Sequence, residues 1–296
     1  KAGVMMEVYY VNCKSGALLA DDNNRAVSHH FTDLPFRIQK IILKHDSQFT
    51  QRLLTSAKQR LEQIRFNAAN SSGSRRDEQE IRLKSFCGLI IEQLCFEMLT
   101  YYNKNPNIKI ELDNSNSPID QVDLTIHKSW YNKQGDLQSI TKTVEVRSSF
   151  PFKSVEKSVA QDFDILGGYT NQVKTCEITK DFYLRFLFAL DYDEAYFIKQ
   201  NERLHYSKTT LNHLQNLYFD DELNLKQDLV IYFIGGATKA MMYDDSIAYD
   251  GNMTSANFNQ NGSANYRKIK ARNALDCIAI MQMMLNCITT ELKTGK

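Results

Sequence analysis

Two acidic side chains, Asp123 and Glu145, lie in neighbouring segments whose composition predicts β-strands. The first strand is expected over residues 121–130 and the second over 139–147, and a turn-forming sequence, Tyr-Asn-Lys-Gln-Gly-Asp, separates them. Carboxylate oxygens are the ligands that Mg²⁺ and Mn²⁺ prefer. The chemistry that this pair could perform is therefore metal-assisted.

The predicted hairpin places the two acids side by side. Side chains alternate along a strand, so Asp123 shares a polar face with Thr125 and His127. If the hairpin is symmetric about Gln134, Asp123 falls directly opposite Glu145. At about 4.5 to 5.5 Å between Cβ atoms, two like charges destabilise a sheet unless a cation lies between them. The alternative is a solvated sheet face on which neither acid has a role.

A third acid, Glu92, lies in the middle of a predicted helix within Gly-Leu-Ile-Ile-Glu-Gln-Leu-Cys-Phe. Apolar residues flank it on both sides, and burying an unpaired carboxylate there would cost several kcal/mol. Glu92 therefore needs a cation or a basic partner. An ion pair with Arg82 or Arg147 is the alternative to a role at a metal site.

The N-terminal elements are read from hydrophobic periodicity. Residues 35–67 predict one or two amphipathic helices, residues 68–76 an exposed loop, and residues 77–102 a helix that is apolar on nearly every face. A strand at 108–112 then joins the hairpin in an antiparallel meander. The basic side chains expected to face outward from the first helical region are Arg52, Lys58, Arg60 and Arg65.

Further elements follow the meander. Helices are expected near 155–166 and 181–190, strands at 194–199 and 228–234, and a long helix over about 266–292. Gly235 and Gly236 are interpreted as a turn that closes the second of these strands, because the spacing of a phosphate-binding P-loop is absent. The fold class is α/β, a mixed β-sheet flanked by helices, with helical additions at both ends.

Composition sets the outer limits. Hydrophobic residues make up 43% of the 296 and charged residues 24%, which is typical of a globular protein, and the net charge of +1 gives no general field for nucleic acid. Six cysteines without a CxxC pair, together with the lack of a long apolar run, favour the cytoplasm. We expect a single domain over 1–296, with a helical addition (1–76), the core motifs (77–175) and the remaining core strands with a C-terminal helix (176–296).

The order of these motifs resembles the PD-(D/E)xK nuclease superfamily, which includes type II restriction endonucleases and phage-defence nucleases. The resemblance rests on Gly88 and Glu92 in a helix, Asp123 in Ser-Pro-Ile-Asp-Gln-Val-Asp, and Glu145-Val146-Arg147 in the next strand. It covers roughly residues 77–175. It implies a restriction-endonuclease-like core, a mixed sheet flanked by helices.

The resemblance also implies a metal site. Asp123 and Glu145, with the backbone carbonyl of Val146, would bind Mg²⁺, for which Mn²⁺ could substitute, and Glu92 would hold a ligand or a water. Asp120 is the alternative to Asp123 if the strand begins earlier. The ion would activate a water for attack on phosphorus and offset the charge that grows on the phosphate oxygens.

Arg147 departs from the family pattern, which has lysine there. Arginine cannot act as a base at neutral pH, but it can donate two hydrogen bonds to a phosphate. Either the metal alone activates the water, or Lys153, Lys157 or Lys174 reaches in from the following segment, or the site is inactive.

Other polar residues are candidates for the catalytic face or for phosphate binding. Gln161 and Lys174 follow a predicted helix, where such nucleases often carry a further catalytic residue; a surface helix that ends at Gly167 and Gly168 is the alternative. Solvated helix ends would explain the phosphate-binding candidates equally well. Those candidates are Arg75, Arg76, Lys153, Arg267 and Lys268, with Lys270 and Arg272 in the same run.

The expected function is a Mg²⁺-dependent endonuclease that hydrolyses DNA, of the restriction or phage-defence kind, acting as a homodimer if it cuts both strands. One alternative is a nuclease for RNA or for branched or damaged DNA. Another is an inactive relative that binds nucleic acid, which Arg147 in place of lysine makes plausible. A third is a cytoplasmic helical protein with no nuclease role.

Overall fold

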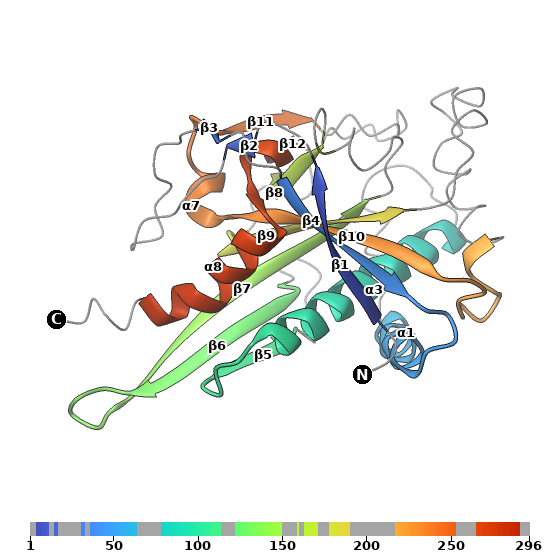
Figure 1. The fold of residues 1–296 in the computed structure, drawn as a ribbon, viewed down its shortest axis with the longest axis horizontal. Helices are drawn as coiled ribbons and strands as arrows, with labels where there is room; N and C mark the ends of the chain where they lie inside the picture. Colours follow the sequence, from blue (N-terminus) through green and yellow to red (C-terminus); the bar gives the residue numbers. More distant parts are fainter. Residues whose placement is uncertain are drawn as a thin grey trace.

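A computed structural model of the chain gives the arrangement of most of the predicted core (Figure 1). The structure describes residues 4–11, 15–16, 31–32, 36–63, 78–113, 122–149, 159, 163–170, 178–189, 217–252 and 265–290.

The centre of the fold is an eight-stranded mixed sheet (Figure 1). Its strands run in the order β1, β4, β10, β9, β7, β6, β5, and β13 adds to β10. Every pairing is antiparallel except that of β7 with β9, which is parallel. The bounds are β1 Val4–Val11, β4 Phe36–Leu43, β5 Ile108–Leu112, β6 Leu124–Tyr131, β7 Leu137–Ser149, β9 Phe182–Ala189, β10 Leu229–Thr238 and β13 Leu275–Asp276.

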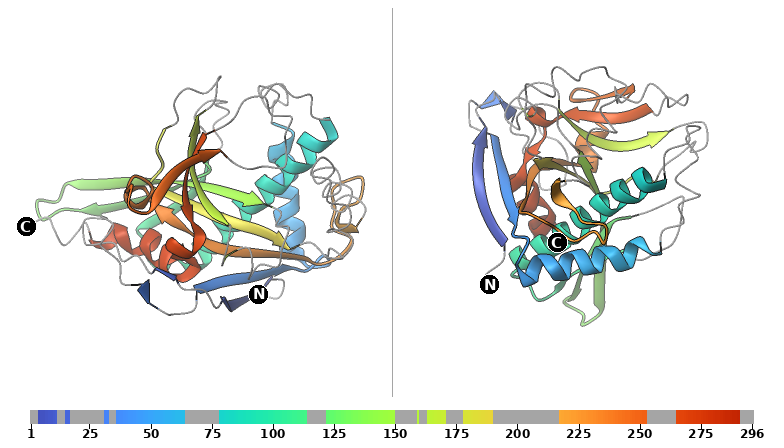
Figure 2. Two further views of the ribbon diagram at one scale, coloured as in Figure 1. Left: turned by 90° about the horizontal axis from the view of Figure 1, so that it is seen from above. Right: turned by 90° about the vertical axis from the view of Figure 1, so that its right-hand side faces the viewer.

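Helices flank this sheet (Figure 2). Helices α1 (Gln48–Leu61) and α3 (Glu78–Tyr102) pack against each other, and α3 contacts β5 and β7. Helix α8 (Cys277–Thr290) contacts β10 and β4, and Ile280 approaches Gly236 beside Leu184. The predicted class, α/β with a mixed sheet flanked by helices, is confirmed.

Two smaller sheets complete the described structure. One contains β11 (Ala248–Asn252), β12 (Asn265–Lys270) and β8 (Asp164–Thr170), and the other pairs β2 (Ser15–Gly16) with β3 (Phe31–Thr32). Two short helical segments, α7 (Lys239–Met242) and η3 (Ala271–Asn273), lie beside them. Within the described ranges no helix is both long and apolar enough to cross a membrane.

The core motifs form as expected. The predicted helix 77–102 is α3, and the three predicted strands are β5, β6 and β7. In the hairpin Leu124 pairs with Val144 and Thr125 with Thr143, which is the register expected from symmetry about Gln134. Leu124, Ile126 and Val144 are buried, whereas Thr125 and Thr143 on the other face keep part of their surface. The sequence therefore predicted both the register and the facing of this hairpin.

The first predicted helical region is wrong over its first half. Residues 36–43 form strand β4, inserted between β1 and β10, and only α1 is helical. The sequence Phe-Arg-Ile-Gln-Lys-Ile-Ile-Leu is rich in β-branched residues, which pack well in a sheet. Its apolar spacing was ambiguous, and the two strands that flank it decide its structure.

The helix expected at 181–190 is also wrong, because these residues form β9. Its sequence, Phe-Tyr-Leu-Arg-Phe-Leu-Phe-Ala, is buried on both faces between β10 and β7, so the alternation that marks a half-exposed strand is missing. Packing between the neighbouring strands therefore determines that these residues form a strand. The parallel pairing with β7 makes β9 the direct neighbour of Glu145 and Arg147.

Gly235 and Gly236 do not close a strand, as the sequence had suggested, since β10 continues through them to Thr238. A bulge occurs at Gly235, whose φ is 142°, a value that strongly favours glycine. A Cβ atom on Gly235 would lie 2.1 Å from the carbonyl oxygen of Leu275, and one on Gly236 would lie 2.3 Å from that of Tyr183. The two glycines therefore allow close approach of neighbouring backbone.

Two more helix predictions need correction. The long helix expected over 266–292 is divided into β12, η3, β13 and α8. Residues 164–166 of the helix expected near 155–166 belong to β8. In both segments pairing with distant strands overrides the local periodicity. The predicted strand at 194–199 lies outside the described residues.

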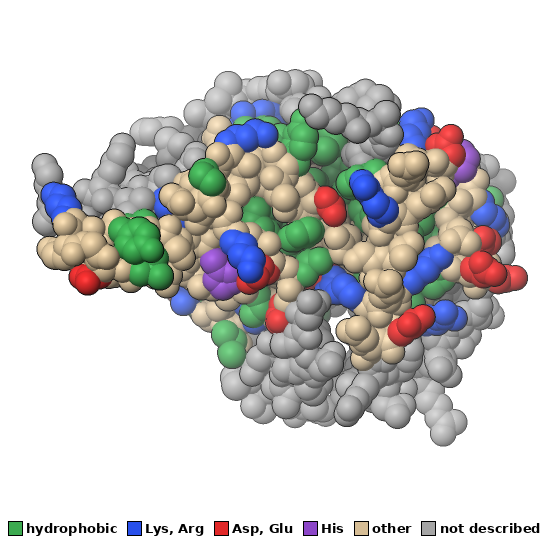
Figure 3. Space-filling view, turned by 90° about the horizontal axis from the view of Figure 1, so that it is seen from below, with side chains coloured by type: hydrophobic (Ala, Val, Ile, Leu, Met, Phe, Trp, Pro, Cys, Tyr) green, Lys and Arg blue, Asp and Glu red, His purple; other side chains and the backbone are tan. Residues whose placement is uncertain are grey.

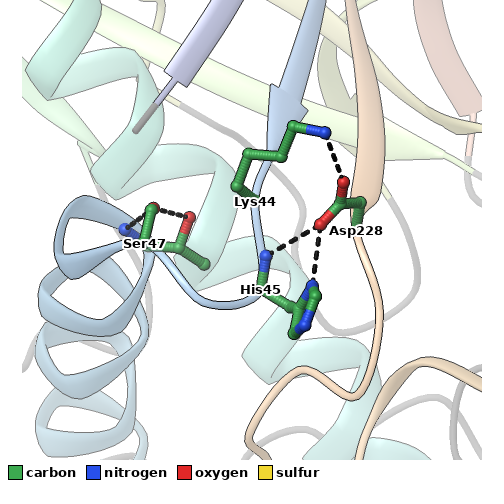
Figure 4. A network of polar contacts seen from close by, with 5 residues as sticks. Lys44, His45, Ser47 and Asp228 are labelled. Atoms are coloured by element: carbon green, nitrogen blue, oxygen red, sulfur yellow. Dashed lines mark hydrogen bonds and ion pairs between the residues drawn. The ribbon is translucent and has the colours of Figure 1, made fainter. Parts of the chain in front are cut away.

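A polar network fixes the turn between β4 and α1 to the start of β10 (Figure 4). Asp228 accepts hydrogen bonds from Lys44 Nζ at 2.6 Å and from the His45 backbone N–H at 3.0 Å, and its Oδ1 lies 2.9 Å from His45 Nδ1. The hydrogen bonds from Lys44 and then His45 hold the pKa of Asp228 well below its usual range. Ser47 next caps α1 by accepting from the Thr50 N–H.

Candidate active site

Asp123 and Glu145 are neighbours in space, as the hairpin register predicts. Asp123 immediately precedes β6, and its N–H donates to the carbonyl of Val144, so the ladder continues one residue beyond the strand. Its Oδ2 accepts a 2.6 Å hydrogen bond from the backbone N–H of Val146. The Asp123 carboxylate is thus held on β7, beside Glu145.

Glu92 joins these acids from α3. The helix is apolar around most of its surface, so its middle packs on the sheet and carries Glu92 inward. The partner of Glu92 is neither Arg82, which is exposed, nor Arg147, the two that the sequence had suggested. It is Arg60 of α1, whose Nη2 lies 2.6 Å from Glu92 Oε2, with both side chains 17% exposed. The expectation that Arg60 faces outward was therefore wrong.

The electrostatics of the three acids are coupled. Burial, followed by the charges of Glu92 and Glu145, raises the pKa of Asp123 well above its usual range, although the Val146 N–H and Arg147 oppose this shift. Burial also raises the pKa of Glu92, against the effect of Arg60, and the charges of Glu145 and Asp113 add to it. The site therefore contains more negative charge than its own basic side chains offset.

Arg147 lies over this cluster on β7. Its Nη2 is 2.7 Å from Glu145 Oε1, and its guanidinium lies 5.8 Å from the centre of the Tyr266 ring. On the neighbouring strand β9, Arg185 pairs with Arg147 in register. The acids therefore have basic neighbours on β7 and β9 as well as on α1.

The described residues include no group of three or more His, Cys, Asp or Glu side chains arranged closely enough to hold a metal ion. Glu92 is bonded to Arg60, Asp123 to a backbone N–H and Glu145 to Arg147. The three acids of the expected ligand set, Asp123, Glu145 and Glu92, lie in one region of the fold, but they are not arranged as metal ligands, and each carboxylate accepts from a donor of the protein.

A groove with a volume of about 920 Å³ runs along α1 and β5 next to these residues. Arg60, Asp113 and Thr125 belong to its lining, so it reaches from the surface to the ion pair of Arg60 with Glu92. On the face shown in Figure 3, acidic and basic side chains are interspersed and do not gather by sign. This face presents no broad basic field.

The remaining predicted site residues divide into two groups. Arg267 and Lys268 lie on β12, where Arg267 is paired with Asp245 and donates 2.8 Å to the carbonyl of Met242, and Lys268 is only 6% exposed. This placement argues against a role for Arg267 and Lys268 in binding phosphates at the surface. The others lie outside the described residues: Gln161, Lys174, Arg75, Arg76, Lys153, Lys157 and Asp120.

Sequence reasoning missed two basic residues of the site, Arg60 and Arg185. Arg60 stands in an ordinary amphipathic helix, and nothing in its local pattern marks it as inward. Arg185 had a usable signal, because a single arginine within Phe-Tyr-Leu-Arg-Phe-Leu-Phe-Ala must be buried in any regular structure.

Comparison with known proteins adds one relative. The chain is similar to the uncharacterized protein MJECS01 of Methanocaldococcus jannaschii, with 31% identity over 175 residues. The match covers 57% of this chain and 60% of the archaeal protein, so it spans less than two thirds of that relative's length. No family model and no solved structure matches the chain.

Proposed function

We propose that this protein is a metal-dependent endonuclease that hydrolyses phosphodiester bonds in DNA. The observation that carries the proposal is that Asp123 is hydrogen-bonded to the backbone of Val146, next to Glu145, and that Glu92 is near enough for the charges of the three acids to act on one another. Burial is the main cause of the raised pKa of Asp123 and of Glu92, and the charges of the neighbouring acids add to it. A divalent cation would offset those charges. Surface acids with a purely structural role have no reason to gather in this way.

The order of the elements supports the proposal. Helix α3 with Glu92, the start of β6 with Asp123, and β7 with Glu145 and Arg147 follow one another in the chain as in the PD-(D/E)xK resemblance. These elements contact one another in a mixed sheet that is flanked by helices. A restriction-endonuclease-like core is therefore part of the proposal.

The residues present suit Mg²⁺ or Mn²⁺ by the chemistry of their donors. Asp123, Glu145 and the Val146 carbonyl would hold the ion, which would supply an activated water and charge neutralisation at phosphorus. Glu92 would orient a ligand or a water, and Arg60 would fix the position of Glu92 through the bond at 2.6 Å. Arg147 would donate to a phosphate oxygen, since it cannot accept the proton of the water.

A second candidate is a catalytically inactive relative that binds nucleic acid. The observation that favours it is Arg147, which stands in place of the family lysine and is bonded to Glu145. A nuclease for RNA or for branched or damaged DNA is a variant of the main proposal, because the same carboxylates would serve any phosphodiester. A homodimer and a restriction or phage-defence role also belong to the proposal.

The test is cleavage of plasmid and linear DNA with Mg²⁺, Mn²⁺ or chelator. The wild type is compared with Asp123→Ala and with a matched control, Asp136→Ala, which removes an exposed acid from the hairpin turn. We expect cleavage that requires metal, is lost in Asp123→Ala and persists in the control. RNA and branched DNA substrates are run in parallel.

Metal-dependent cleavage that survives in Asp123→Ala would sink the proposed site. The absence of cleavage on every substrate, followed by its appearance in Arg147→Lys, would establish the inactive relative instead. Discrete product bands would mark a sequence-specific endonuclease.

A further inference from the structure

Arg185 is a buried arginine in the middle of β9, with only 4% of its surface exposed. Its guanidinium stacks on Phe163 at 4.7 Å from the ring centre, and Nη2 donates a 2.7 Å hydrogen bond to Ser149 Oγ. The Nε atom is buried and has no hydrogen-bond partner. One side of the guanidinium is thus anchored, while its Nε–H remains unsatisfied.

Arg185 lies next to another positive charge. It is in register with Arg147 on the adjacent parallel strand, so both side chains leave the same face at the usual strand spacing of about 4.8 Å. Burial first, and then the charge of Arg147, lowers the pKa of Arg185 to about 9, while Tyr266 and Asp164 oppose the shift. Among the described residues no acidic side chain forms an ion pair with Arg185. At neutral pH the guanidinium remains charged.

Two guanidinium groups on neighbouring strands repel each other, and this is costly when one of them is buried unless an anion accompanies them. Glu145 is bonded to Arg147, whereas within the described residues Arg185 has no carboxylate bonded to it. A phosphate group fits this position, because its oxygens accept the paired N–H groups of arginine in a fork-like geometry. Arg147, with its side chain 21% exposed, connects the pair to solvent.

We infer that Arg147 and Arg185 together form a binding site for one phosphate group of the nucleic acid substrate. This inference rests on the proposed function and deepens it, because it assigns Arg185 on β9 as a phosphate-binding residue and Arg147 as its partner. The link from Arg147 to Glu145 places the bound phosphate beside the proposed metal ligands. The group is either an internal phosphodiester or the terminal phosphate of a strand end.

A purely structural role for Arg185 predicts something different. In that case Arg185 only connects β7 to β9 and to β8 through Ser149 and Phe163, and removing it changes stability without changing any affinity for anions. Phosphate affinity is therefore the readout that separates a binding residue from a structural one.

The experiment is calorimetric titration of the full chain with inorganic phosphate in the presence of chelator, at constant ionic strength. We expect the wild type to bind phosphate and Arg185→Gln to bind it about tenfold more weakly or worse, as removal of a charged hydrogen-bond donor predicts. The matched control, Arg82→Gln, removes an exposed arginine of α3 and should bind like the wild type.

No phosphate binding by the wild type, or equal binding by Arg185→Gln, would overturn the inference. If Arg185→Gln does not fold, Arg185→Lys is used to test the inference, because lysine keeps the positive charge but lacks the paired N–H donors of the guanidinium. Several-fold weaker binding by the lysine variant supports the site, and unchanged binding overturns it. Since no metal is present and no bond is cleaved, this result is independent of whether the protein proves to be a nuclease.

Competition with short oligonucleotides identifies the kind of phosphate. Strands with a 5′-phosphate, a 3′-phosphate or only hydroxyl ends are tested against inorganic phosphate in the same chelator buffer. Stronger competition by one phosphorylated end assigns the site to a terminal phosphate. Equal competition by all three assigns it to the internal backbone.

Discussion

Two carboxylates in this molecule, Asp228 and Asp123, have opposite electrostatic surroundings. Asp228, at the surface, accepts hydrogen bonds from Lys44 and His45, and these lower its pKa. Asp123, beneath α3, lies against Glu92 and Glu145, and burial with these charges raises its pKa. The first carboxylate is matched by its donors, whereas the second is placed among groups that repel it.

The contrast separates a structural arrangement from the one proposed to be functional. Asp228 joins two distant parts of the sheet, and its charge is satisfied within the protein. The cluster of Asp123, Glu92 and Glu145 is electrostatically incomplete, which is a common property of sites that bind or react. Variants that act on one group and spare the other test this distinction.

The largest stability effect is expected at Arg60. Arg60→Gln leaves Glu92 without its basic partner in a mostly buried position. We therefore expect the free energy of unfolding to fall by about 2 kcal/mol. This loss is smaller than that for a fully buried ion pair, because both side chains keep some exposure. Denaturant unfolding measures it. Lys44→Gln, which removes the exposed partner of Asp228, should have little effect.

The double variant Arg60→Met with Glu92→Leu should recover much of this loss, because neither member of the pair is then left as an unpartnered buried charge. Equal stability of Arg60→Gln and Lys44→Gln would show that the two ion pairs do not differ as the comparison requires.

A smaller effect is expected from Mg²⁺. Binding to the folded protein alone stabilises it by roughly 1.4 kcal/mol when Mg²⁺ is present at ten times its Kd. Thermal unfolding with and without Mg²⁺ measures this stabilisation. We expect it for the wild type and for Asp228→Asn, but not for Asp123→Asn. A similar gain in Asp123→Asn would mean that Mg²⁺ binds elsewhere.

The smallest effect is on the pH dependence of stability without metal. Because the pKa of Asp228 is lowered by folding, its contribution is present above its unfolded pKa of about 3.9 and is lost as the pH falls. Folding raises the pKa of Asp123. The contribution of Asp123 to stability is therefore present below about pH 3.9 and is lost as the pH rises through the raised pKa.

Asp228→Asn should therefore flatten the acid side of the stability profile, and Asp123→Asn should flatten the decline with rising pH. Chemical denaturation at a series of pH values measures both. Profiles that change in the same direction would contradict the opposite surroundings of the two carboxylates.

The acidic half of the candidate site was predictable because it depends on local pairing. The turn at Gln134 fixes the hairpin register: Asn132 Oδ1 accepts from the N–H groups of Gln134 and Asp136, and Gly135 has φ of 86°. A register fixed by a turn brings Asp123 to Glu145 without any information from the rest of the chain.

The basic half depends on contacts between distant elements. Arg60 reaches Glu92 only because α1 packs on α3, and Arg185 reaches Arg147 only because β9 pairs in parallel with β7. The same cause explains why β4 and β9 were mistaken for helices: each is a short apolar run whose structure is decided by the strands on either side.

The position of β4 between β1 and β10 also sets the order in which the chain can fold. The contact of His45 with Asp228 bridges 183 residues, and the pairs of β4 with β10 bridge more, so this side of the sheet cannot close until most of the chain has left the ribosome. During synthesis the apolar sequence Phe-Arg-Ile-Gln-Lys-Ile-Ile-Leu has only β1 as a partner. The nascent chain therefore presents an open strand edge to chaperones before it presents a completed sheet.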